Sequence, residues 1–345
     1  MLAKFSACLV AVAAAATVVQ GAPSTPHIVY LLVDDWGWAD VGYHRPPGYK
    51  EISTPNMDAL VQVGVELDNH HSYKFCSPTR SAIQCGRNPI HANVQNVSPF
   101  TWNEKNKLTG YSGVPPNMTG MGAVLKQAGY ATHAVGKWDA GMATPEQSPK
   151  GRGYDTSLIY YGHQNDYWTF KWTDCGGIYD LWTHNETNIV QPVNMTGCVY
   201  EEKVLSDYVE NVISTHDVST PLFMFWATHS IHAPYQIPQY WEDKFSFINE
   251  TNRRRYHAMV HYVDSALGNV TQLLKDRGMW DDTLLVVTSD NGGPIHGYGG
   301  ANNYPMRGGK GSNFQGGMRV NAFVSGGFVP EAQRGKKLTG LGAVW

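Results

Sequence analysis

Apolar residues along the chain form several short continuous runs that are separated by polar segments. Runs rich in β-branched and aromatic residues predict strands that are buried on both faces of a sheet. Four such runs occupy residues 27–33, 221–227, 283–288 and 320–325. Residues 252–277 instead place apolar side chains at helical spacing, which predicts a long helix covering the sheet. We therefore predict an α/β fold, and the length of 345 residues suits one large domain.

Oxygen-bearing side chains come directly after two of these strands. Asp34 and Asp35 follow the first strand, and Asp290 and Asn291 follow the third. Adjacent carboxylates at the end of a buried strand repel each other and lose hydration, which a bound cation offsets. Open α/β sheets also bind their ligands at the carboxyl ends of strands. These residues predict a site for Ca²⁺, or less favourably Mg²⁺, and not for zinc. The alternative is an exposed acidic turn.

A cysteine, Cys76, lies at the start of another predicted helix. Pro78 stiffens the first turn, Arg80 follows one helical step after the cysteine, and Gly86 marks the helix end. Free backbone N–H groups and the helix dipole favour negative charge at such an N-terminus, so the segment suits the binding of an anion. The alternatives are a structural cysteine beside the helix cap and a disulfide between Cys76 and Cys85.

Two basic residues follow other predicted strands. Lys137 comes after a strand at residues 131–135. A lysine in that position is usually solvated, but beside a site for anions it supplies a positive charge. His232 lies just past the strand at residues 221–227 and before a proline turn. Most histidines are surface or hydrogen-bonded core residues. The position of His232 sets it apart from the other histidines, so we single it out as a candidate.

Charge and composition narrow the class of protein. The net charge is −3, and the only basic run, residues 253–255, is predicted to lie on a solvated helix face, so nothing favours nucleic-acid binding. Residues 1–21 have the features of a secretory signal peptide, and no later stretch is predicted to span a membrane. We therefore predict a protein of the secretory pathway, either extracellular or in a lysosome-like compartment. Sequons that support glycosylation begin at Asn96, Asn117, Asn185, Asn194, Asn249 and Asn269.

Residues 154–200 are aromatic and irregular. Such loops often form the wall of a substrate pocket, but ordinary packing explains them equally well. Within this region, Cys175 and Cys198 bracket a polar excursion. A disulfide between them is predicted in an oxidising compartment.

The order of these motifs resembles that of the type I sulfatases. The signature of that family is similar to Cys76-x-Pro78-x-Arg80 followed by a Gly-Arg pair, although Thr79 stands where serine is usual and Cys85 where threonine is usual. The resemblance covers about residues 27–330 and is strongest to the arylsulfatase B group, the N-acetylgalactosamine-4-sulfatases. The matching motifs are residues 31–38, 54–60, 76–87, 136–138, 221–234 and 289–293.

The resemblance implies an alkaline-phosphatase-like fold, in which helices flank both faces of a large mixed, mostly parallel sheet. Residues 22–345 would form the N-terminal catalytic domain, truncated before the small C-terminal subdomain of the family. In that family a formylglycine-generating enzyme oxidises the cysteine to formylglycine (3-oxoalanine). The hydrated aldehyde then attacks the sulfate ester of a small molecule or glycan, and the sulfated enzyme later eliminates sulfate.

Roles for individual residues follow from the same resemblance. Arg80 would hold the formylglycine hydroxyl, while Lys137, His232 and Lys310 would bind the sulfate. The Ca²⁺ ligands would be Asp34, Asp35, modified Cys76, Asp290 and Asn291. The resemblance thus implies a calcium-dependent sulfuric ester hydrolase.

Two positions depart from the family pattern. Asp139 stands where the family has a histidine that helps to deprotonate the hydrated aldehyde and to release sulfate, and Gln315 replaces a common acidic residue. A carboxylate accepts protons but also repels sulfate, so an impaired protein that binds sulfated glycans without turnover is one alternative.

A phosphatase or phosphodiesterase of the same superfamily is another alternative. Those enzymes usually have Ser or Thr as nucleophile and two metals, whereas this chain has Cys76 and ligands for one metal.

Overall fold

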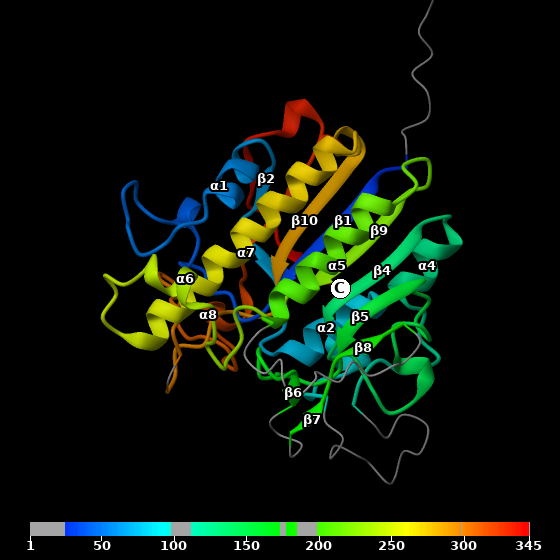
Figure 1. The fold of residues 1–345 in the computed structure, drawn as a ribbon, viewed down its shortest axis with the longest axis horizontal. Helices are drawn as coiled ribbons and strands as arrows, with labels where there is room; N and C mark the ends of the chain where they lie inside the picture. The colour runs from blue at the N-terminus through cyan, green and yellow to red at the C-terminus, as the bar shows by residue number, and fades with distance from the viewer. Residues whose placement is uncertain (1–24, 98–111, 173–176, 185–198, 298, 345) are drawn as a thin grey trace, which may run out of the picture.

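The computed structural model describes residues 25–97, 112–172, 177–184, 199–297 and 299–344. These residues form a nine-stranded sheet with helices on both of its faces (Figure 1). Neighbouring strands pair in parallel from β10 to β5, whereas β11 is antiparallel to β10 and β2, and β8 is antiparallel to β5. The predicted α/β fold with a mixed, mostly parallel sheet is therefore confirmed. The strand order is β12 (Lys336–Leu338), β2 (Val65–Leu67), β11 (Ala322–Ser325), β10 (Thr283–Ser289), β1 (His27–Val33), β9 (Leu222–Ala227), β4 (Ala131–Lys137), β5 (Thr156–Tyr160) and β8 (Trp182–Thr183).

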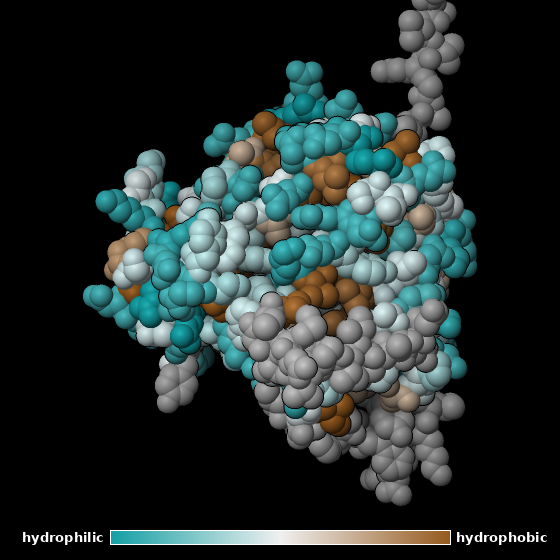
Figure 2. Space-filling view, viewed as in Figure 1, coloured by the Kyte–Doolittle hydropathy of each residue, from teal (hydrophilic) through white to brown (hydrophobic). Residues whose placement is uncertain are grey.

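Alternate side chains of the central strands supply two hydrophobic cores, as the period of two along a strand requires. Val29, Leu31 and Val33 of β1 pack in the core that also takes the apolar faces of α1 (Pro55–Gln62), α5 (Glu201–Thr215) and α7 (Thr251–Asp276). Leu32 belongs to the other core, beneath α2 (Cys76–Cys85) and α4 (Met121–Gln127). The α5 and α7 helices run across the sheet face seen in Figure 1, and Figure 2 shows a mainly hydrophilic outer surface there.

The shorter elements lie at the ends and edges of the sheet. They are α3 (Pro89–Ala92), α6 (Gln239–Asp243), α8 (Gln315–Met318), the pair β3 (His70–His71) with β13 (Gly342–Ala343), and the pair β6 (Lys171–Trp172) with β7 (Ile178–Tyr179). The long elements begin and end within two residues of their predicted positions. Their apolar periodicity was sufficient because each of them buries an apolar face in one of the two cores.

Several predictions concern residues outside the described part of the chain. The signal peptide, the Cys175–Cys198 disulfide and the sequons at Asn185 and Asn194 all stay predictions for that reason. The other four sequon asparagines are exposed, as a glycosylated residue must be. Among the described residues, no helix is long and apolar enough to cross a membrane.

Candidate active site

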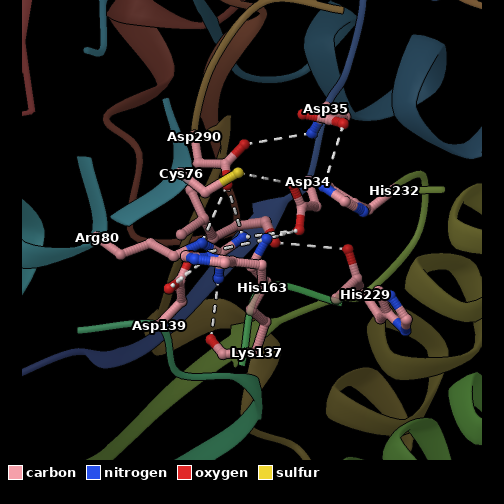
Figure 3. A network of polar contacts seen from close by, with 12 residues as sticks. Asp34, Asp35, Cys76, Arg80, Lys137, Asp139, His163, His229, His232 and Asp290 are labelled. Atoms are coloured by element: carbon pink, nitrogen blue, oxygen red, sulfur yellow. Dashed lines mark hydrogen bonds and ion pairs between the residues drawn. The ribbon is translucent and has the colours of Figure 1, made fainter. Parts of the chain in front are cut away.

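The carboxyl ends of the central strands lie at one edge of the sheet and face the N-terminus of α2. Because β1 is parallel to both of its neighbours, the residues that follow it lie beside those that follow β9 and β10. Figure 3 shows that Cys76 and Arg80 of α2 point toward Asp34, Lys137 and Asp290, which lie at the ends of three strands. The structure therefore gathers residues that lie far apart in the sequence.

Cys76 is the first residue of α2, and its buried Sγ lies 3.6 Å from Asp34 Oδ1. The helix ends at Gly86, whose φ of 62° is left-handed, as glycine allows. Cys76 and Cys85 are the two ends of this helix, about 13 Å apart at 1.5 Å per residue. Disulfides need Cα atoms within about 7 Å. A bond between the two cysteines is therefore excluded, and both are free.

Arg80 lies one turn after Cys76 on the same face of α2 and is completely buried. Its Nε and Nη2 donate to Asp290 Oδ2 at 3.0 and 2.8 Å, and its Nη1 donates to the Lys137 carbonyl at 2.9 Å. Nη2 also lies 3.4 Å from Asp34 Oδ2. Arg80 thus connects α2 to the ends of three strands and fixes their spacing.

Two lysines pair with the adjacent carboxylates that follow β1. Lys137 Nζ lies 2.6 Å from Asp34 Oδ2 in a fully buried pair, so this lysine is not solvated. Burial acts to lower the pKa of Lys137, but the charge of Asp34 outweighs it and raises that pKa. Lys310 Nζ lies 2.7 Å from Asp35 Oδ1 and 2.9 Å from Oδ2. Both ammonium groups are therefore held charged where an anion would approach.

Asp290 and Asn291, two of the ligands expected for a cation, both contact Asp35. Asp35 N–H donates to Asp290 Oδ1 at 3.2 Å, and Asn291 Nδ2 donates to Asp35 Oδ1 at 2.7 Å. Ligand atoms within 4.8 Å of one another are supplied by Asp34, Asp35, Cys76 and His232. Burial and the neighbouring charge of Asp34 raise the pKa of Asp290 to about 7.

The amide oxygen of Asn291 tests whether these residues fit a cation. Asn291 is fully buried, and its Oδ1 has no hydrogen-bond partner among the described residues. A buried polar atom without a partner is uncommon and calls for an explanation. An unpaired amide oxygen beside crowded carboxylates matches the hard oxygen ligands that Ca²⁺ and Mg²⁺ prefer. The donor set therefore fits such a cation.

His232 is held as a neutral imidazole with its Nε2 directed to the site. Its Nδ1 lies 2.6 Å from the Ala233 carbonyl oxygen, which only accepts hydrogen bonds, so Nδ1 carries the proton. Its Nε2 lies 3.6 Å from Asp35 Oδ2. Burial, followed by the charge of Lys310, lowers the pKa of His232 to about 3. Nε2 is thus free to accept a proton.

Comparison with known proteins decides the family. Residues 26–340 match the family model described as Sulfatase. This chain belongs to the sulfatase family. It is 36% identical over 304 residues to arylsulfatase J of Mus musculus, and the aligned region covers 87% of this chain and 48% of that protein. It is 29% identical over 325 residues to N-acetylgalactosamine-6-sulfatase of Homo sapiens, covering 88% of this chain and 58% of that protein. The chain therefore spans about half the length of these relatives.

A solved structure gives the same result for the fold. The crystal structure of Ps i-CgsB in complex with k-i-k-neocarrahexaose has a TM-score of 0.78 and 28% identity to this sulfatase-family chain. The match covers 93% of this chain and 69% of that chain. The family resemblance predicted from the Cys76 segment is thus confirmed.

Asp139 is a position at which this sulfatase-family chain departs from the family pattern, and the structure shows its surroundings. The side chain is fully buried, and Ser77 Oγ donates to its Oδ1 at 2.7 Å. His163 Nδ1 lies 3.0 Å from the same oxygen, and Lys137 Nζ lies 3.8 Å from Oδ2. Burial acts to raise the pKa of Asp139, but His163 and Lys137 outweigh it and lower that pKa. The carboxylate is therefore ionised, with cationic or hydrogen-bonding groups around it. Gln315, the other departure, begins α8 and is exposed.

His163 is a candidate residue that the sequence reasoning missed. It comes three residues after β5, which pairs in parallel with β4. It therefore lies at the same edge of the sheet as Lys137. The signal that identified His232, a histidine just past a strand end, applied to His163 as well.

The described part of the aromatic region at residues 154–200 both packs in the core and lines a cavity. Tyr167 and Trp172 are buried, and Tyr167 stacks on the His229 ring with centroids 3.9 Å apart. A cavity of about 410 Å³ is lined in part by Tyr161, Trp172, Tyr179 and Trp182. The region therefore combines packing with a pocket wall.

Proposed function

We propose that this chain hydrolyses sulfate esters, with Cys76 oxidised to formylglycine and with Ca²⁺ as the bound cation. The observation that carries the proposal is the burial of Cys76 between Asp34, Arg80 and Lys137, at the end of a helix whose dipole favours anions. Mg²⁺ fits the same oxygen ligands less well, because it demands stricter octahedral geometry.

When present, the aldehyde supplies the nucleophile as its hydrate, and the cation lowers the repulsion between two anions. Asp34, Asp35, Asp290 and Asn291 would hold the cation together with residue 76. The chain's own basic side chains would stabilise the negative charge of the substrate. Fixed positive groups stabilise charge best when they are buried and positioned before the substrate arrives. The ion pairs of Arg80 with Asp290 and of Lys137 with Asp34 meet that condition.

Sulfate binding is assigned to Lys137, His232 and Lys310. Lys310 and His232 line a cavity of about 670 Å³ together with Asp35, which gives the substrate a route to the cation ligands. His232 Nε2 is unprotonated in the free site, and the negative charge of a bound sulfate would raise the pKa of His232 so that Nε2 donates to a sulfate oxygen or to the leaving oxygen. Arg80 positions residue 76 from within the same helix.

The substrate class is proposed from the relatives and from the cavities. The names of arylsulfatase J and N-acetylgalactosamine-6-sulfatase, and the complex of Ps i-CgsB with k-i-k-neocarrahexaose, favour aryl sulfates or sulfated glycans. Aromatic pocket walls suit the faces of sugar rings and aryl groups alike. We place the protein in the secretory pathway, extracellular or lysosome-like, where the formylglycine-generating enzyme would act on it during maturation.

The test of this proposal is mass spectrometry of the peptide that contains residue 76, from protein made in a secretory host. The aldehyde is expected in place of the thiol, and the same preparation is expected to hydrolyse 4-nitrophenyl sulfate. An unmodified thiol would contradict the enzyme assignment. Aldehyde without turnover would favour the second candidate, a glycan-binding protein, for which the observation is the carboxylate of Asp139 in place of histidine. Turnover of 4-nitrophenyl phosphate by unmodified protein would favour a phosphatase.

A substitution of His163 tests whether this histidine compensates for the negative charge of Asp139 beside the site. His163→Asn is expected to lower kcat on 4-nitrophenyl sulfate about 10- to 100-fold, since the buried Asp139 carboxylate then repels sulfate with less compensation. The measurement is steady-state kinetics of the single variant, of Asp139→Asn and of the double variant. If His163 acts by compensating the charge of Asp139, His163→Asn has little effect in the Asp139→Asn background. Independent, multiplying effects would show that the contact has no role in turnover.

A further inference from the structure

The cavity at the site extends to the first turns of α7. Its volume is about 670 Å³, and its lining includes Asn252 and Arg255 of α7 together with Asp35, His232 and Lys310. Pockets of about 300–1,000 Å³ hold ligands of drug size, so this space greatly exceeds the needs of one sulfate group. The cavity therefore has room for further parts of a substrate, and those parts would lie against Arg255.

The charge around Arg255 is not balanced by its neighbours. Glu242 of α6 accepts from Arg254 Nε at 2.9 Å through Oε1 and from Arg255 Nε at 3.0 Å through Oε2. One carboxylate thus serves two guanidinium groups, which leaves one net positive charge. The terminal nitrogens of Arg254 donate hydrogen bonds to the Ile248 carbonyl and to Thr251 Oγ1. The terminal nitrogens of Arg255 have no hydrogen-bond partner among the described residues, and 42% of its side chain is exposed.

The helix geometry explains why only one arginine of the run at residues 253–255 enters the cavity. Asn252 and Arg255 are three residues apart and share a face of α7. Arg253 is directed away, toward Glu51 at 2.9 Å and the Gly300 carbonyl at 2.8 Å. The predicted solvated basic face is thus solvated only in part, because each arginine also pairs with a carboxylate. Of the three arginines, Arg255 is the one that lines the cavity and whose terminal nitrogens have no hydrogen-bond partner among the described residues.

We propose that Arg255 binds a second anionic group, a carboxylate or a further sulfate, on a glycan whose scissile sulfate lies at Cys76. The inference rests on the proposed function and narrows its substrate to polyanionic glycans. A guanidinium group donates two parallel hydrogen bonds to either anion. The Nε contact with Glu242 holds the group in place, and Arg255 lines the cavity. The overall charge of −3 gives no general attraction for polyanions, so the recognition is local.

The experiment compares substrates with and without the second anion on the full chain. The substrates are a monosulfated disaccharide with a uronic acid, its carboxyl-reduced analogue, a disulfated disaccharide and 4-nitrophenyl sulfate. For the disaccharide that carries the recognised anion, Arg255→Met is expected to lower kcat/KM about 10- to 100-fold more than it does for 4-nitrophenyl sulfate. The loss is expected mainly as a higher KM. Arg255→Lys is expected to restore part of the loss, since it returns the charge without the bidentate geometry.

Arg254→Met is the matched control, because Arg254 shares Glu242 but does not line the cavity. It is expected to leave the ratio between substrates unchanged, whatever its effect on thermal stability. The uronate and disulfate arms show which anion Arg255 recognises. Equal effects of Arg255→Met on all four substrates would overturn the proposal. If the wild-type protein turns over none of these substrates, the proposed function fails. The binding affinity of the same disaccharides, measured by calorimetry, then tests the role of Arg255. An affinity that is unchanged in Arg255→Met would reject binding of the second anion by Arg255.

Discussion

Cys76→Ala is expected to lower kcat/KM on 4-nitrophenyl sulfate by more than about 10⁴-fold, the order of loss on removing a catalytic nucleophile. The physical reason lies in the surroundings of residue 76. Burial, followed by the charges of Asp290 and Asp34, raises the pKa of the Cys76 thiol well above its ordinary value. A neutral thiol is a poor nucleophile, so the unmodified side chain does not replace the aldehyde.

The control for this prediction lies on the same helix. Cys85→Ser changes the cysteine at the opposite end of α2, which is also free and only partly buried, and is expected to retain wild-type kinetics. Thermal unfolding of both variants checks that each one folds. Turnover by Cys76→Ala within tenfold of wild type would show that residue 76 is not the nucleophile.

Asp290→Asn is expected to weaken Ca²⁺ binding at least about 100-fold and to lower turnover accordingly, because second-shell changes alone cost 10- to 100-fold at metal sites. Asp290 meets both Arg80 and the cluster around Asp35, so its charge serves the cation and the arginine together. Calorimetry with CaCl₂ measures the affinity, and activity after chelation is expected to return on adding Ca²⁺ to wild-type protein only.

A second acidic cluster provides the control. His44, Glu66 and Asp68 also place ligand atoms within 4.8 Å of one another, but Lys337 and Arg319 already neutralise that group. Asp68→Asn is therefore expected to leave Ca²⁺ affinity at the wild-type value. Equal affinities of the Asp290→Asn and wild-type proteins would remove Asp290 from the cation site.

Much of the site was predictable because strand ends are visible in a sequence. An apolar run marks a buried strand, and parallel strands bring their carboxyl ends to one edge, so Asp34, Asp35, Asp290 and Asn291 were expected together. Cys76 was found by its place at a helix start and by a family signature. Each of these signals is local, and none depends on knowing which side chains meet.

The sequence alone predicted the long strands and helices in their order along the chain, the polar residues that follow the strands, and the cysteine at the start of α2. Only the tertiary structure decided which charges compensate one another. It buried Lys137 against Asp34, placed His163 beside Asp139 and set Glu242 between two arginines so that one faces the cavity. The physical reason is that burial follows from patterns along the chain, whereas electrostatic interactions depend on distances of a few ångströms between segments far apart in sequence.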